Sequence, residues 1–277
     1  MPELPEVELV AQSLNKLVSG RKIVAAELLR MQLAPANSPA EFAGRLKNSR
    51  IEFVLRRGKH ILFYLDSAQV LIAHLRMTGR FLLLPVEREL PKHSHAVFYL
   101  ADEARLVFQD QRHFGMMKIV EKSKLFETKE LACLAPEPFS EEFSLEYFRA
   151  ALKTSRRNLK EFLLDQTKVC GLGNIYAAEA LFLANVNPQI AAEKLSAKRA
   201  AVLHEKIRFV LSESIEHGST LNIDPENIDG SYYGGVYEGH WRVYDRENEA
   251  CPTCATAIKR IVQGSRSTFF CPKCQKK

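Results

Sequence analysis

The sequence predicts a multidomain α+β protein with a β-rich first half, a helical middle and a small cysteine-rich end. Three observations predict this: apolar segments of strand length recur up to residue 100, the apolar period becomes helical beyond residues 135–139, and four cysteines recur in pairs near the C-terminus. A chain of 277 residues is also long for one compact core. We therefore expect domains at residues 1–132, 133–240 and 241–277.

The chain begins with MPELPEVELV, in which Pro2 is followed by Glu3, Glu6 and Glu8. Proline suits the first turn of a helix, and acidic side chains there complement the positive end of the helix dipole. The pattern predicts an N-terminal helix. It also puts a proline nitrogen beside several carboxylates, which a helix start explains without any catalytic role.

Strand-length apolar segments follow, separated by turn signals such as Arg57-Gly58 and Thr78-Gly79. Short apolar runs between turn residues are typical of an all-β sandwich or barrel, so we expect one of these behind the N-terminal helix. The predicted strands cover residues 51–55, 60–65, 69–75, 80–84 and 95–100.

The Pro-rich residues 135–139 resemble a linker, and the segments beyond them have a helical period. Ser196 is a candidate N-cap of a long helix that ends at His217-Gly218. Shorter helices are expected at residues 144–153, 158–164 and 174–184. Residues 219–240 are rich in glycine and tyrosine without periodicity, which indicates either a loop that closes over a ligand or a plain connector.

The C-terminal cysteines form two Cys-x-x-Cys pairs, Cys251 with Cys254 and Cys271 with Cys274. Two such pairs supply four thiolates to Zn²⁺, and a complete thiolate set leaves no position for a substrate. We therefore expect one structural Zn²⁺. Disulfides are the alternative, which the reducing interior of a cell disfavours.

Charge is unevenly distributed along the chain. The whole chain has 39 Lys+Arg and 33 Asp+Glu, whereas residues 251–277 contain basic side chains and no acidic one. A cationic module indicates a polyanionic partner, although basic tails are often only solvated surface. Since no run of about 20 apolar residues occurs, we expect no membrane association and a cytoplasmic protein.

Five motifs in one order give the chain a family resemblance: MPELPEVE, HLRMTG, DQRHFG, the Gly171-Leu-Gly-Asn174 turn between two helices, and the paired cysteines. In these motifs the chain resembles the bacterial formamidopyrimidine-DNA glycosylase family along essentially its whole length. The resemblance implies an N-terminal β-sandwich with a helix, a helix-two-turn-helix domain with a lesion-recognition loop, and a C-terminal β-hairpin zinc finger. Its Gln111 and Cys170 depart from the usual family residues, proline and a small residue, without touching the implied chemistry.

The implied function is a bifunctional base-excision repair enzyme. Members of this family remove oxidised purines, 8-oxoguanine and formamidopyrimidines, through a Schiff base on an N-terminal proline, and cleave the strand by β,δ-elimination. The implied partner is double-stranded DNA that contains oxidised bases or abasic sites. The resemblance further implies a monomer that acts at the bacterial nucleoid.

The resemblance also assigns roles to individual residues. Pro2 matches the family's nucleophile, and Glu3 matches its acid. Glu6 matches its supporting carboxylate, and Lys59 matches its hairpin lysine. His74, Asn174 and Arg266 match the family's phosphate clamp. The resemblance also implies that Arg266 assists the second elimination. His93 and Arg157 match further DNA contacts of the family. The residues that fill the gap left by an extruded base match Met77, Arg112 and Phe114.

The chemistry suits a terminal proline. An α-amino group of pKa near 8 is roughly 10% free base at pH 7, against about 0.04% for a lysine side chain. Attack of this secondary amine on C1′ of the sugar yields a permanently charged iminium, which acidifies C2′ for elimination. Base removal and strand cleavage can therefore share one intermediate.

Other interpretations remain open at this stage. A glycosylase of the endonuclease VIII type would act on oxidised pyrimidines, and a non-catalytic zinc-ribbon protein would bind DNA without needing the N-terminal Pro-Glu. Taken singly, Met77 and Phe114 could be core residues, and Arg112 and Lys59 could be exposed surface charges.

Overall fold

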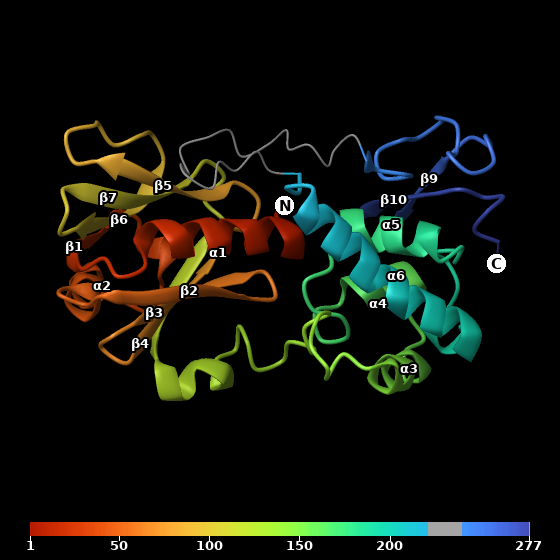
Figure 1. Ribbon diagram of the computed structural model, residues 1–277, viewed down its shortest axis with the longest axis horizontal. Helices are drawn as coiled ribbons and strands as arrows, with labels where there is room; N and C mark the ends of the chain where they lie inside the picture. The colour runs from red at the N-terminus through yellow and green to blue at the C-terminus, as the bar shows by residue number, and fades with distance from the viewer. Residues whose placement is uncertain (221–239, 277) are drawn as a thin grey trace. The chain divides into compact units, whose positions relative to one another are not determined.

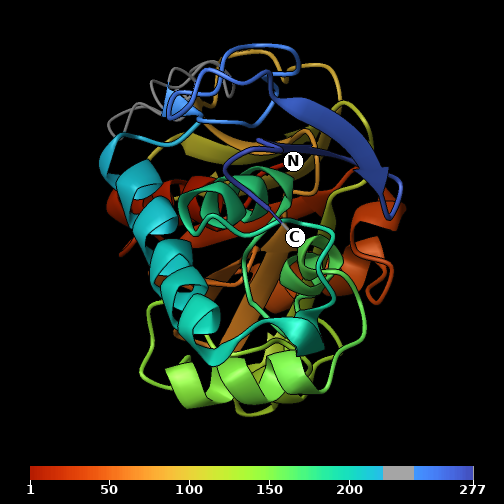
Figure 2. The same ribbon diagram turned by 90° about the vertical axis from the view of Figure 1, so that its right-hand side faces the viewer.

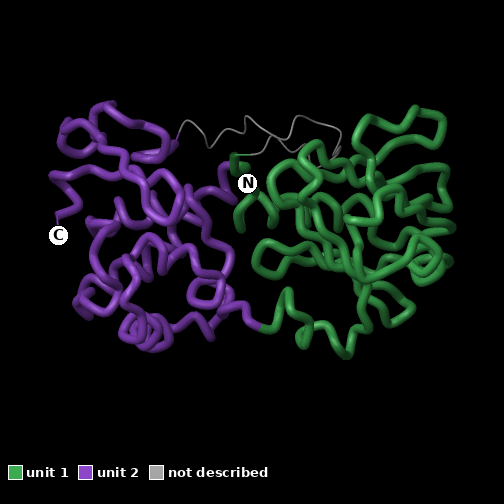
Figure 3. Tube along the Cα trace, turned by 180° about the vertical axis from the view of Figure 1, so that it is seen from behind, with its two compact units in different colours: residues 1–132, 218–235 green, residues 133–217, 236–277 purple. Residues whose placement is uncertain are grey.

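The computed structural model describes residues 1–220 and 240–276 (Figure 1). The described chain divides into two compact units (Figure 3). The first holds residues 1–132 and 218–220, and the second holds residues 133–217 and 240–276. Each unit is described by itself. No helix within the described residues is long and apolar enough to cross a membrane.

The first unit is a β-sandwich of two four-stranded antiparallel sheets, as predicted. One sheet has the order β1-β6-β7-β5 and the other β2-β3-β4-β8. The strands are β1 Ile23–Leu28, β2 Ile51–Arg57, β3 His60–Leu65, β4 Gln69–His74, β5 Gly79–Pro85, β6 Ser94–Leu100, β7 Ala104–Asp110 and β8 Met116–Glu121. The five predicted strands are β2 to β6, whereas β1, β7 and β8 were not predicted.

Helix α1, Leu4–Val18, packs on the sandwich. Its buried residues Val7, Val10, Leu14 and Val18 recur at helical spacing and join the core, which explains why this segment is a helix with one apolar face. The short helix α2, Pro39–Leu46, begins at a Ser38–Glu41 capping box. Two 3₁₀ turns, η1 Met31–Leu33 and η2 Lys122–Glu127, complete the unit.

The ring of Phe108 lies in the core under two loops of the sandwich. A Cβ on Gly79 would lie 2.5 Å from the Leu75 carbonyl oxygen and 2.7 Å from the Phe108 ring. A Cβ on Gly115 would also lie 2.7 Å from that ring. Glycine at both positions therefore lets the loops at residues 75–79 and 110–115 close over Phe108.

The second unit contains four α-helices within its described residues: α3 Leu145–Lys153, α4 Leu159–Leu164, α5 Asn174–Leu183 and α6 Ala197–Glu216 (Figure 2). A 3₁₀ turn, η3 Ala192–Lys194, precedes α6. The side chains of Ser144, Asn158 and Ser196 cap α3, α4 and α6 by accepting a backbone N–H three residues later. These caps are local signals, which is why the helices begin where the sequence predicts.

The same unit carries a β-hairpin, β9 Lys259–Gln263 and β10 Arg266–Phe270, that packs on α5. Phe269 and Cys271 share a small core with Ala178 and Phe182 of α5. The predicted zinc-finger hairpin is therefore present. The division into three domains at residues 132 and 240 stays a prediction, and residues 221–239 of the predicted closing loop lie outside the described residues.

The Phe108 packing generates a first prediction. Gly79→Ala should lower the free energy of unfolding by about 1–3 kcal/mol, because the new methyl group overlaps backbone and a buried ring. The matched control is Gly44→Ala in α2, where a Cβ meets nothing within 4 Å. There alanine should be neutral or stabilising by up to about 1 kcal/mol. Urea unfolding of both variants measures this, and equal effects would contradict the packing argument.

Candidate functional site

The N-terminal turn buries two carboxylates beside Pro2. Glu3 is 3% exposed, Glu6 is 1% exposed, and Pro2 is also buried. The Glu6 Oε2 atom accepts a hydrogen bond from the Glu3 backbone N–H at 2.8 Å. The predicted nucleophile, the predicted acid and the predicted supporting carboxylate therefore lie together at the start of α1, where fraying would be the ordinary behaviour of a terminus.

The second oxygen of Glu6 reaches a distant part of the chain. Its Oε1 accepts a hydrogen bond from Thr220 Oγ1 at 2.9 Å and lies 3.4 Å from the Thr220 backbone N. The sequence analysis did not identify Thr220. A hydroxyl in a stretch without periodicity carries no signal of its own, so only the folded chain reveals this contact.

Lys59 lies in the turn between β2 and β3 and is only 7% exposed. The alternative that it is an exposed hairpin cation is therefore wrong. The next residue, His60, pairs with His74 across β3 and β4, and their rings meet edge to face with centroids 4.7 Å apart.

The two histidines are held neutral. Burial lowers the pKa of His60 to about 4. Burial, and after it the neighbouring His60, Arg76 and Lys59, lower the pKa of His74 to about 2. His74 Nδ1 accepts a hydrogen bond from the Arg76 backbone N–H at 2.9 Å, which leaves the proton of the neutral ring on Nε2. His74 is thus a neutral donor.

A buried carboxylate joins the loops that carry the predicted gap-filling residues. Asp110 accepts hydrogen bonds from the backbone N–H groups of Gly115 at 2.7 Å and Arg112 at 3.2 Å, and from the Thr78 hydroxyl. Burial pushes the pKa of Asp110 up, but these hydrogen bonds outweigh it and lower the pKa overall. Asp110 belongs to the DQRHFG motif, but its role was not identified from the sequence.

Met77, Arg112 and Phe114 lie on these two joined loops. Phe114 is 54% exposed, so the alternative that it is a core residue is wrong. The Arg112 guanidinium lies 5.1 Å from the centre of the Phe114 ring, and Met77 is half-buried. His93 is exposed nearby, with its ring centroid 5.5 Å from that of His113.

In the second unit, Asn174 begins α5 after the Gly171-Leu-Gly turn. Its Nδ2 donates to the Ser267 carbonyl at 2.9 Å, and its own carbonyl accepts from Lys160 Nζ at 2.8 Å. Among the described residues, the buried Oδ1 of Asn174 has no hydrogen-bond partner. The fully buried Lys160 was not identified from the sequence.

Two predicted arginines line one hollow of about 450 Å³. Arg157 lies on its rim and pairs with Asp165 at 3.2 Å, while Arg266 is the exposed first residue of β10. Glu161 and Asp165 line the same hollow. The fold thus brings Arg157 and Arg266 together at this hollow. Asn174 donates to the carbonyl of Ser267, the residue that follows Arg266 in the chain.

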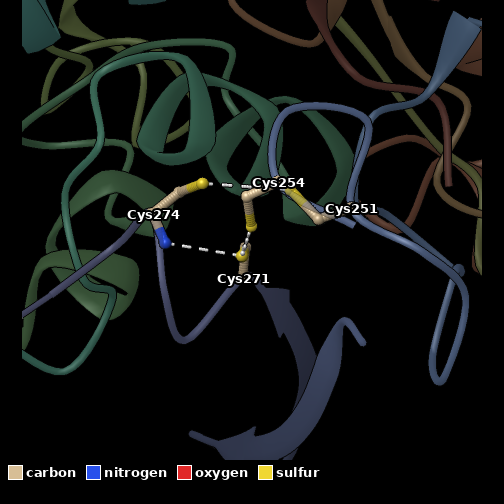
Figure 4. Close-up of side chains that lie close together, drawn as sticks. All are labelled: Cys251, Cys254, Cys271 and Cys274. Atoms are coloured by element: carbon tan, nitrogen blue, oxygen red, sulfur yellow. Dashed lines mark hydrogen bonds between the residues drawn. The ribbon is translucent and has the colours of Figure 1, made fainter. Parts of the chain in front are cut away.

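The four C-terminal cysteines converge (Figure 4). Their sulfur atoms lie within 4.8 Å of one another, with Cys254–Cys271 at 3.5 Å and Cys251–Cys274 at 3.9 Å. Corners of a tetrahedron with Zn–S bonds of about 2.3 Å are about 3.8 Å apart. A disulfide needs about 2.05 Å, so these pairs are not disulfides. The donor set fits one structural Zn²⁺.

Glu179 of α5 is a further buried carboxylate, with no exposed surface. It accepts hydrogen bonds at 2.9 Å from the backbone N–H groups of Arg242, Val243 and Tyr244, which fastens the segment leading into the cysteine module. Burial raises the pKa of Glu179 despite these donors. A signal was present, because one glutamate inside the apolar segment NIYAAEALFL implies a buried charge that needs donors.

Three family models match the chain in order. They are the formamidopyrimidine-DNA glycosylase N-terminal domain at residues 1–117, the formamidopyrimidine-DNA glycosylase H2TH domain at residues 134–224, and the zinc finger found in FPG and IleRS at residues 248–277. The last match agrees with the geometry of the four cysteines, which hold one structural Zn²⁺.

Relatives match over the full length. The formamidopyrimidine-DNA glycosylase of Bacillus licheniformis is 40% identical over 278 residues and is matched over 100% of both chains. A Lactococcus lactis Fpg in complex with abasic-site DNA has a TM-score of 0.91 and 31% identity, over 99% of this chain and 100% of that chain. A variant of the same protein with Fapy-dG-containing DNA has a TM-score of 0.92 and 32% identity, over 100% of both chains.

The cysteine cluster generates a prediction about metal. Cys271→Ser should lose stoichiometric zinc and unfold the hairpin, because metal binding contributes directly to the folding of such modules, while the β-sandwich stays folded. Zinc analysis and circular dichroism measure this. The control is Cys133→Ser, because Cys133 is exposed and lies outside the cluster. Full zinc content in Cys271→Ser would contradict the ligand assignment.

The buried histidines generate a prediction about pH. Below its ordinary value of 6.5, His60 gains a proton in the unfolded chain but not in the folded one until pH falls to about 4. The free energy of unfolding should therefore fall with pH in this window, by about 1.4 kcal/mol per pH unit for this ring. His60→Phe should flatten the dependence by that amount in urea unfolding. Parallel curves for wild type and variant would refute the assignment.

Proposed function

The chain belongs to the formamidopyrimidine-DNA glycosylase family, and on this premise we propose that it removes oxidised purines from double-stranded DNA and cleaves the abasic strand by β,δ-elimination. The observation that carries the proposal is the burial of Glu3 and Glu6 in the turn that follows Pro2. Acid catalysis beside a terminal amine needs this arrangement, whereas a DNA-binding protein without catalysis does not.

Pro2 acts as the nucleophile after removal of Met1. Its secondary amine attacks C1′ of the damaged nucleotide as the bond from C1′ to the base breaks. The sugar ring then opens at the C1′–O4′ bond, O4′ takes a proton, and the resulting iminium acidifies the C2′ protons for elimination. The position of Glu3, buried directly after Pro2, supports its role as the acid that protonates the opening sugar, because a general acid must lie within reach of the reacting atoms.

Glu6 positions the reactive terminus. Its carboxylate holds the Glu3 backbone N–H and the Thr220 hydroxyl, so the residue that follows Pro2 has a fixed place. A displacement of the amine by about 1 Å is enough to cost much of the rate of such a reaction. We therefore count Glu6 and Thr220 as positioning residues, and Glu3 and Pro2 as catalytic residues.

The first unit contacts the DNA backbone through Lys59 and His74. Lys59 supplies a cation for the phosphates and for proton transfer, and His74 donates from Nε2. Because the pKa of His74 is about 2, its contribution to binding does not depend on protonation near neutral pH. His93 makes a further DNA contact.

Extrusion of the damaged base leaves a gap, at a cost of a few kcal/mol. Met77 and Phe114 enter this gap as apolar wedges, and Arg112 donates to the orphaned base of the opposite strand. The exposure of Phe114 and its contact with Arg112 support this role, since a ring that lies outside the core can reach a base step.

The second unit contacts phosphates through Asn174, Arg157 and Arg266. Arg157 must exchange its Asp165 partner for a phosphate, and Arg266 also assists the second elimination. We further propose the three-domain division at residues 132 and 240, and a monomer that acts in the bacterial cytoplasm at the nucleoid.

Borohydride trapping tests the reaction. The wild type should form a covalent adduct with duplexes that contain 8-oxoguanine or an abasic site, because a reducible iminium joins Pro2 to the sugar. Pro2→Gly should trap on the order of tenfold less, since its primary amine gives an imine that is charged only when protonated. Gel analysis of the reduced products measures both.

The matched control is the same chain with an N-terminal extension that blocks the amine, which should bind the duplex and trap nothing. Undiminished trapping by the blocked protein would exclude Pro2. Efficient trapping on thymine glycol with none on 8-oxoguanine would exclude the purine preference and favour an endonuclease VIII-type specificity.

A further inference from the structure

His113 stands between Arg112 and Phe114 in a conformation that needs support. Its φ angle is +61°, in the left-handed region that non-glycine residues seldom adopt. The residue is exposed, so packing of its side chain in the core does not hold it there. A specific contact must therefore stabilise the tip of this loop.

That contact is a hydrogen bond between two imidazole rings. His113 Nδ1 lies 2.9 Å from His95 Nε2, and the ring centroids are 4.9 Å apart at near-perpendicular planes. His95 lies on β6 and is 5% exposed. Its Nε2 also lies 2.8 Å from the Asp110 carbonyl oxygen, at the base of the same loop.

The positions of the protons follow from these partners. A carbonyl oxygen can only accept, so His95 Nε2 carries a hydrogen and donates. His113 Nδ1 is then the second acceptor of that hydrogen, and the proton of the neutral His113 ring lies on its Nε2. A second proton on His113 would put an N–H group against the N–H of His95. The contact therefore exists only while the His113 ring is neutral.

We propose that His113 is a positioning residue, which sets Arg112 and Phe114 for entry into the DNA helix through the hydrogen bond that its neutral ring accepts from His95. The inference rests on the proposed function, in which Arg112 meets the orphaned base and Phe114 enters the gap. Selectivity for the opposite base then weakens in acid, because protonation of the pair releases the tip of the loop.

Titratable and charged groups surround the pair. Burial, and then the neighbouring His113 and Arg30, lower the pKa of His95, against the opposing effect of the Asp110 carbonyl and carboxylate. His113 faces His93 and is flanked by Arg112. His95 therefore stays the neutral donor of the pair, and His113 Nδ1 is the acceptor on which the contact depends.

Two variants of His113 test the proposal. Asparagine tolerates a positive φ, can accept from His95 through its side-chain oxygen, and does not titrate. Alanine offers no acceptor. The readout is the ratio of single-turnover excision of 8-oxoguanine opposite cytosine to excision opposite adenine, between about pH 5.5 and about pH 8, the range in which histidine titrates. The ratio cancels the titration of Pro2 and Glu3, which act equally on both duplexes.

In the wild type the ratio should fall about fivefold between the neutral and the acidic end of this pH range. A change of about fivefold corresponds to about 1 kcal/mol, the smallest discrimination expected from one good contact with a base. His113→Asn should keep the neutral-pH ratio at every pH, and His113→Ala should have the low ratio throughout. A second readout needs no catalysis. The fluorescence of 2-aminopurine opposite a tetrahydrofuran abasic analogue should increase on binding in proportion to the insertion of the wedge residues. This increase should depend on pH and on the two variants in the same way as the excision ratio.

Arg112→Ala separates this inference from the proposed function. If it leaves the ratio unchanged at all pH values, the role of Arg112 fails and the inference with it. If Arg112→Ala lowers the ratio, two results overturn the inference alone: a wild-type ratio in His113→Ala, or a wild-type pH dependence in His113→Asn.

Discussion

The buried carboxylate of Glu6 is the group on which the reactive end of this chain depends. It takes hydrogen bonds from the Glu3 backbone at one oxygen and from Thr220 at the other, so it joins the first turn of α1 to a residue near the end of the sandwich unit. A buried charge without such donors would cost several kcal/mol. A chain terminus, which ordinarily frays, is thereby held in one place.

The same device recurs twice more. Asp110 and Glu179 are also buried carboxylates, and each takes most of its hydrogen bonds from backbone N–H groups of a single segment. Backbone donors supply most of the hydrogen bonds of these carboxylates, and Arg242 lies 3.8 Å from Glu179 as well. Arg112 and Arg266 remain exposed, as contact with a polyanion requires. The interior fixes the positions of loops and leaves positive charge at the surface.

Histidine serves this fold in its neutral form. His74 donates from one nitrogen because the other accepts a backbone N–H, and its burial keeps it uncharged. His95 is likewise buried and donates to the Asp110 carbonyl and to His113. A neutral imidazole offers one donor and one acceptor, so each ring has a defined orientation. His113 accepts this hydrogen bond at the surface of the protein.

The sequence by itself determined whatever local signals encode. The Ser196 helix cap, the helix at residues 158–164, the strand-length segments that became β2 to β6, and the four cysteine ligands were predicted because each signal spans a few residues. Tertiary structure alone decided the burial of Lys59, the Thr220–Glu6 contact and the His95–His113 pair. The physical reason is separation along the chain: these contacts join residues whose neighbours in sequence have no pattern that predicts the partner, and only the packing of sheets and loops brings them within hydrogen-bonding distance.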